Sequence, residues 1–181
     1  MKIIFSLIGL LSISLSAGAA VSPAAKKPFK TSAILRGTGA IHGGMAGTGF
    51  SLLGIKSQVA KSKKLERLTV GMGDAKFNSY SGAPGYFHIE NAPGSKRVVI
   101  NFMQTLNSKF DEKAVQKVFA QSPFVQKSEM VFDSQTQTTS LILNLKKPVS
   151  VRAIPVNGKQ KQMAQLKVDL FEDSLLKRKK M

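Results

Sequence analysis

Cysteine is absent from this chain of 181 residues. Its absence excludes disulfide bonds, thiolate metal sites, cysteine nucleophiles and a lipid-modified N-terminal cysteine. The fold must therefore depend on a hydrophobic core, and about 160 residues are enough to build one core of ordinary size.

Histidine is nearly as scarce, with two copies, and the common catalytic motifs are missing too. His88 and Glu90 would share one face of a strand, but the H-x-E motif of zinc deaminases also needs paired downstream cysteines. No G-x-S-x-G elbow occurs, and nothing marks a catalytic pair among the ten scattered acids. We therefore expect no metal, no cofactor and no catalytic residues. A hydrolase with an unrecognised site is the least favoured of three interpretations of the function.

Acidic residues are few, and all ten lie between Glu66 and Asp173. The formal net charge is +17, but residues 65–173 contribute little of it, with fourteen basic and ten acidic residues. Residues 26–64 hold eight basic residues and no acid, and residues 174–181 hold four more. Such basic flanks attract polyanions. Anionic polymers of a cell envelope are the expected partners, with at most peripheral membrane contact and no nucleic acid.

Only one apolar run is long, and it stands at the N-terminus. Lys2 precedes the apolar stretch from Ile3 to Leu15, and Ala17-Gly18-Ala19 fits an A-x-A cleavage site. Thirteen helical residues rise only about 20 Å, too short for a bilayer core of about 30 Å. The pattern predicts a signal peptide over residues 1–19 and a protein exported to the periplasm or cell envelope.

Two segments lack a clear strand pattern. Residues 20–64 are predicted to be a flexible, basic, Gly/Ala-rich N-terminal segment. Its glycine-rich part, 37–49, fits neither a phosphate loop nor a dinucleotide fingerprint and is interpreted as a mobile loop. Residues 50–55 would add a short strand, and residues 174–181 are predicted to be a basic tail.

From Leu65 onward, apolar residues alternate with polar ones in short runs separated by turn residues. The pattern predicts an all-β fold, a two-sheet β-sandwich of about seven strands with one short helix. The strands are expected at 65–72, 84–90, 97–103, 125–132, 138–145, 149–156 and 164–171. Pro155 predicts an edge or a bulge in its strand. The helix would begin at Asp111-Glu112 and end before Ser122-Pro123.

Three of these strands carry one polar residue at the same place: 98–102 (VVINF), 141–145 (LILNL) and 166–170 (LKVDL). Alternation places Asn144 and Asp169 on the face opposite the leucines, while Asn101 shares its face with Val99 and Met103. We therefore interpret the repeated polar residue as a sign of fold rather than of a ligand site.

These strands resemble the AMIN domain of bacterial cell-envelope proteins. The resemblance rests on residues 96–102 (KRVVINF), 139–145 (TSLILNL) and 166–170 (LKVDL), and it covers about 65–173. Asn stands at positions 101 and 144, where the family more often has an acid. The resemblance implies two packed β-sheets and a role in targeting proteins to peptidoglycan.

The candidate contact residues are basic side chains with aromatic neighbours. An arginine fork suits carboxylates, and a tyrosine ring can stack on a sugar. The candidates are Tyr80, Tyr86, Lys96, Arg97, Lys146, Lys147 and Arg152. The alternative interpretation of the basic residues is an ordinary solvated surface.

The sequence thus predicts a non-enzymatic, exported envelope-binding domain, with peptidoglycan as the favoured ligand. The alternative is a protein-interaction adaptor in the assembly of a pilus, secretin or other envelope machine. Exposed edge strands at 149–156 or 164–171 would favour the adaptor, because strand addition needs a free edge.

Overall fold

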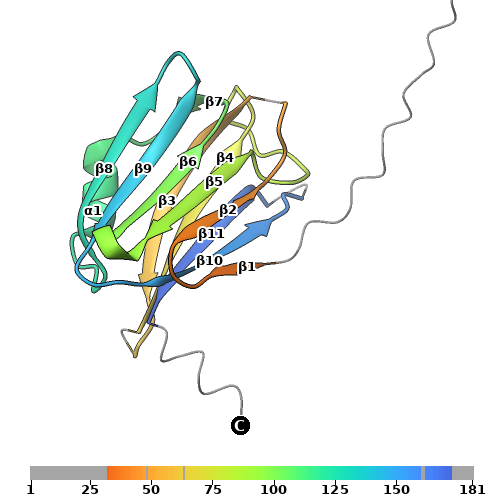
Figure 1. Cartoon of the computed structure of the whole chain (residues 1–181). Helices are drawn as coiled ribbons and strands as arrows, with labels where there is room; N and C mark the ends of the chain where they lie inside the picture. The colour runs from red at the N-terminus through yellow and green to blue at the C-terminus, as the bar shows by residue number, and fades with distance from the viewer. Residues whose placement is uncertain (1–31, 48, 63, 160–161, 173–181) are drawn as a thin grey trace, which may run out of the picture.

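The computed structural model describes residues 32–47, 49–62, 64–159 and 162–172. The predicted signal peptide and the tail at 174–181 lie outside these residues. The described chain folds as two β-sheets packed face to face, so the predicted all-β sandwich is confirmed (Figure 1).

The first sheet has six strands in the order β1-β10-β11-β4-β3-β7, all antiparallel except the pair β3–β7. These strands are β1 (Ala33–Leu35), β10 (Ser150–Val156), β11 (Ala164–Phe171), β4 (Leu65–Gly73), β3 (Phe50–Val59) and β7 (Thr105–Ser108). The second sheet is antiparallel throughout, with the order β2-β5-β6-β9-β8. Its strands are β2 (Gly39–Gly43), β5 (Phe87–Ala92), β6 (Arg97–Phe102), β9 (Thr138–Leu145) and β8 (Val125–Asp133).

The core lies between the sheets and is built from alternate residues of each strand. Leu141, Leu143 and Leu145 of β9 are at most 2% exposed, and the alternate positions of β11 are as deeply buried. Each such side chain contributes about 1.5–3 kcal/mol when it is removed from water. Asn144 and Asp169 lie on the faces away from this core, as the alternation predicts, and Asn101 does so too.

All seven predicted strands are present, with bounds that differ by at most three residues. The described part of the chain holds eleven strands, however, not about seven. The additional four are β1, β2 and β7, which are short, and β3, which extends well beyond the predicted 50–55.

The prediction of a flexible segment over 20–64 is wrong from residue 33 onward, because β1, β2 and β3 lie there. The glycine-rich part of this segment contributes β2, which pairs with β5. Glycine permits this packing: the Phe87 ring fills the space beside Gly43, and a Cβ on Gly44 would lie 2.1 Å from the Gly85 carbonyl oxygen. Small residues here bring β2 onto the sheet instead of leaving a loop.

Pro155 lies in β10, which is an internal strand between β1 and β11. The predicted bulge is absent, since β10 pairs with β11 in continuous register from Ser150 to Val156. β1 reaches only as far as Ala153, so no β1 residue lies beside Pro155. β11 is internal as well, so neither 149–156 nor 164–171 is an edge strand of the kind that would favour the adaptor alternative.

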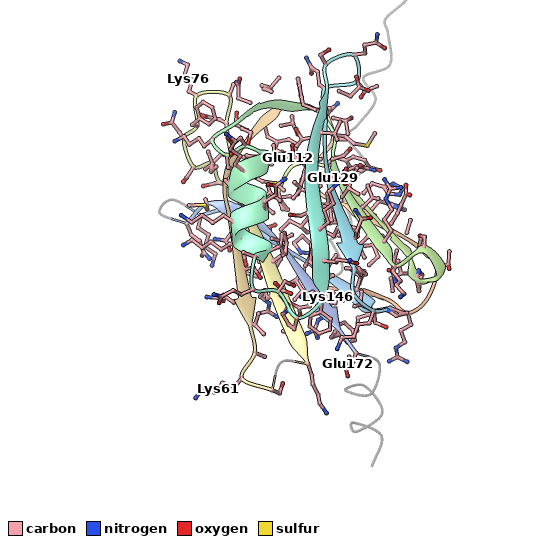
Figure 2. All side chains as sticks on the ribbon, turned by 90° about the vertical axis from the view of Figure 1, so that its left-hand side faces the viewer. Lys61, Lys76, Glu112, Glu129, Lys146 and Glu172 are labelled. Carbon is pink, nitrogen blue, oxygen red and sulfur yellow. The ribbon has the colours of Figure 1, made fainter. Side chains whose placement is uncertain are left out.

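The predicted helix is present as α1 (Glu112–Phe119). Asp111 is its N-cap, and the Asp111 carboxylate accepts a hydrogen bond of 2.9 Å from the Ala114 N–H. Val115 and Phe119 are buried, and α1 packs against β8 and β3 at one open side of the sandwich (Figure 2). Among the described residues, none of the helices is long and apolar enough to cross a lipid bilayer.

Candidate functional site

Five connections between strands lie at one end of the sandwich. They are the β1–β2 turn, the β3–β4 hairpin, the turn between β5 and β6, the segment from α1 to β8 and the residues that follow β9. Backbone hydrogen bonds hold these connections together: the Leu145 N–H donates to the Lys96 carbonyl at 2.7 Å, and the Lys146 N–H donates to the Phe124 carbonyl at 2.8 Å.

Basic side chains gather at this end, which we call the basic end. We define it by Lys61, Lys64, Lys96, Arg97, Lys146 and Lys147, and the exposed Arg36 of the β1–β2 turn lies at the same end. All six defining residues are exposed except Lys147, which is half-buried. Figure 2 shows Lys61, Lys146 and Glu172 at the same end of the molecule. Four of the seven sequence-predicted contact residues thus lie together, and Lys61 and Lys64 join them from the β3–β4 hairpin.

The acids at the basic end offset only part of this charge. Glu172 forms an ion pair with Lys147, and the hydrogen bond from Lys147 lowers the pKa of Glu172. Glu66 is 1% exposed and faces inward, so it offers little negative charge to solvent. The described residues at the opposite end mix both signs: Asp74, Asp111, Glu112 and Asp133 lie among Lys76, Lys109, Lys113 and Lys159. The charge of the described residues is therefore polarised along the strand axis.

Contacts with buried residues hold two of the lysines in place. The Glu66 carboxylate accepts a hydrogen bond of 2.5 Å from the Ser57 hydroxyl and another from the Ser122 hydroxyl. The Ser122 carbonyl in turn accepts a hydrogen bond of 2.6 Å from the Lys146 Nζ. The Lys147 Nζ lies 4.9 Å from the centre of the Phe124 ring, a cation–π distance. These contacts hold the ammonium groups near fixed positions.

Lys96 and Arg97 are positioned by a backbone turn, whereas Lys146 and Lys147 are positioned by side-chain contacts. Lys96 follows the 3₁₀ turn Pro93–Ser95 with φ 51°, in the left-handed region, and its N–H donates to the Pro93 carbonyl. Arg97 begins β6 on the face away from the core, opposite Asn144. Both side chains are exposed, so the turn projects two adjacent cations into solvent.

The remaining three predicted contact residues lie elsewhere. Tyr86 is at the far end of β5, where its carbonyl accepts from the Met103 N–H, about 20 Å along the strands from Arg97. Tyr80 is in the loop before β5, packed against the core, and burial raises the pKa of its phenol. The structure therefore does not bring the tyrosines beside the basic end.

Arg152 lies on the outer face of the first sheet, where it binds Asp169. Asp169 is 0% exposed and sits between two arginines from neighbouring strands, Arg152 on β10 and Arg67 on β4. Burial would raise the pKa of Asp169, but hydrogen bonds from Arg67 and Arg152 outweigh it and lower that pKa. Sequence reasoning did not identify Arg67 or its link to Asp169.

His88 and Glu90 are adjacent on the outer face of β5, with 3.3 Å between His88 Nε2 and Glu90 Oε1. β2 places His42 directly opposite His88. Within the ranges that the structure describes, no group of three or more histidines and acids is arranged to hold a metal ion.

The structure thus offers one polarised cationic surface and one arginine-flanked carboxylate. Comparison of the chain with protein-family models and with curated proteins gives no match.

Proposed function

We propose that this protein is a non-enzymatic, exported binding domain whose basic end holds an anionic polymer of the cell envelope, with peptidoglycan as the favoured ligand. The observation that carries the proposal is the grouping of six basic residues from separate connections at one end of the sandwich, with Glu172 already paired. The signal-like N-terminus and the resemblance to the AMIN domain support the choice of an envelope polymer.

The physical argument is one of charge density. Each basic side chain near an anionic surface contributes about 1 kcal/mol at moderate ionic strength. Contacts between several fixed cations and a polymer that carries repeated carboxylates add together, whereas a single exposed ion pair contributes little. The positions of Lys146 and Lys147 are fixed by their contacts, which lowers the entropic cost of binding.

Two charge-matched triple variants test this proposal. Replacement of Lys64, Lys96 and Arg97 by glutamine removes three charges from the basic end without touching the Glu66 contacts. The control, K76Q/K113Q/K159Q, removes three charges from exposed side chains elsewhere. Both variants have the same net charge.

The measurement is co-sedimentation of the full chain with purified cell-wall sacculi at low salt. The basic-end triple should bind about 100-fold more weakly, the effect of about 3 kcal/mol, and the control should stay within a few-fold of the parent. Equal losses in the two triples would mean that only total charge matters. Failure of the parent to sediment would refute the wall ligand.

The adaptor alternative is supported by one different observation. β8 is one of the two edge strands of the second sheet, and Val131 and Phe132 near its end are 50% and 53% exposed. An exposed apolar edge can accept a strand from a partner protein. Retention of envelope proteins on the immobilised chain in high salt, with loss on V131K substitution, would favour this function, because salt weakens polyanion binding.

A further inference from the structure

A shallow depression of about 600 Å³ lies at the outer face of the first sheet, beside the β3–β4 hairpin. It is lined by Gln58, Val59, Ala60, Lys61, Leu65 and Arg67. Two of these residues are cationic, one is an amide and three are apolar. Lys61 also belongs to the basic end, so the two surfaces are continuous.

Arg67 joins this depression to the buried carboxylate of Asp169. The Arg67 Nε lies 2.6 Å from Asp169 Oδ1, and its Nη2 lies 2.9 Å from Asp169 Oδ2. These bonds occupy one edge of the guanidinium group. Its Nη1/Nη2 edge has no hydrogen-bond partner among the described residues, and the Arg67 side chain is 36% exposed. An arginine fixed along one edge therefore presents a second two-donor edge to solvent.

The charge balance of the group is also incomplete. Arg152 approaches the same carboxylate, with its Nε at 2.9 Å and its Nη2 at 2.6 Å from Asp169 Oδ2. One arginine would neutralise Asp169, so the second leaves an excess positive charge on this face. A planar anion at the free edge of Arg67 would balance that charge, and a carboxylate matches the two-donor edge.

We infer that the depression binds a carboxylate that stands next to a small apolar group, such as the C-terminal carboxylate of a peptide that ends in alanine. The Nη1/Nη2 edge of Arg67 receives the carboxylate, and Lys61 adds a second positive charge. Val59, Ala60 and Leu65 contact the neighbouring methyl group, and Gln58 offers an amide to the peptide backbone. This inference deepens the proposed function. It rests on that function only for the source of the carboxylate, an envelope polymer.

The probe is acetylated dialanine with a free C-terminal carboxylate, titrated into the ¹⁵N-labelled full chain and followed by backbone amide shifts. We expect a dissociation constant on the order of 1 mM, with shifts concentrated at residues 58–61, 65 and 67. The C-terminal amide of the same peptide should bind at least about tenfold more weakly, because it loses a charge-assisted pair of hydrogen bonds. Equal binding of the acid and the amide would overturn the inference, and so would tighter binding of inorganic phosphate.

Two variants test whether the peptide binds in the depression. R67K keeps the charge but loses the two-donor edge, and it should weaken dialanine binding about tenfold. K61Q lies in the exposed hairpin, outside the contacts of Asp169, so it tests the same site even if R67K is unstable. K56Q, on the outer side of β3 outside the depression, is the control and should leave the affinity unchanged. Unchanged affinity in K61Q and in folded R67K would overturn the assignment.

The K64Q/K96Q/R97Q triple separates this site from the proposed function. That variant should lose sacculus binding and keep its affinity for dialanine, since none of the three residues lines the depression. Loss of both activities in a folded triple would show that the depression does not act as a separate carboxylate site.

Discussion

The substitution of Asp169 by asparagine is the sharpest test of the arginine-flanked carboxylate. Asp169 is 0% exposed and accepts four hydrogen bonds, two from Arg67 and two from Arg152. Asparagine keeps the shape but has one acceptor oxygen, and its NH₂ group points donors at a guanidinium that also only donates. Two arginines then face each other without a counter-charge.

The expected loss of stability follows from this geometry. Removal of one partner of a buried ion pair costs about 3–5 kcal/mol. Here the two arginine side chains are 36% and 31% exposed, so solvent screens part of their charge. We therefore expect D169N to lower the free energy of unfolding by about 2–4 kcal/mol, and Tm by roughly 5–15 °C.

Urea unfolding at pH 7 measures the loss, with E90Q as the control because Glu90 is exposed. The control should change the free energy of unfolding by about 0.5 kcal/mol or less. A loss below about 1 kcal/mol in D169N would refute the reasoning, since it would mean that water replaces the carboxylate at little cost.

The same substitution has a defined pH dependence. Because the folded pKa of Asp169 is lowered, its ionised form contributes stability that is fully present above its unfolded pKa of about 3.9. That contribution is lost as pH falls through the folded pKa. The stability difference between the parent and D169N should therefore be constant from about pH 7 to 5 and shrink below about pH 4. A difference that grows in acid would contradict this assignment.

Three further substitutions test the packing around the proposed surfaces, each by urea unfolding. S122A removes a hydroxyl donor from the buried carboxylate of Glu66 and should cost about 1–3 kcal/mol, whereas a cost near zero would mean that water replaces the donor. G44A forces a Cβ against a neighbouring carbonyl at a position with φ +87° and should cost about 2 kcal/mol, and a neutral result would show that β2 packs less closely. D111A removes the N-cap bond to Ala114 and should cost about 0.5–2 kcal/mol. An unchanged stability would mean that this cap does not stabilise the fold.

The strands from residue 65 onward could be predicted because each shows strict alternation with turn residues between them. β9 and β11 are clear cases, with leucines and valine on one face and polar residues on the other. β2 was missed because three of its five residues are glycine or alanine, so the strand shows no clear alternation of apolar and polar side chains. β3 was only partly predicted because a bulge between Leu52 and Gly54 shifts its alternation midway.

The surfaces were predicted less completely, because they depend on which distant strands become neighbours. Lys96, Arg97, Lys146 and Lys147 could be named from charge and nearby aromatics, but nothing local indicates that the β3–β4 hairpin lies beside them. Asp169 and Arg67 are 102 residues apart, and only the β11–β4 register makes them partners. Arg152 was chosen as a contact residue for its charge, and the structure shows that it binds Asp169.

The two proposed surfaces act over different distances, and this explains how both can serve one ligand. The basic end works through net charge, which in physiological salt extends about 8 Å into solvent and needs no particular shape. The free edge of Arg67 acts only at hydrogen-bond distance and requires a planar acceptor. Lys61 belongs to both surfaces, so a polymer attracted by charge is held beside the depression. In the proposed function, the first surface raises the local concentration of carboxylates, and the second selects among them.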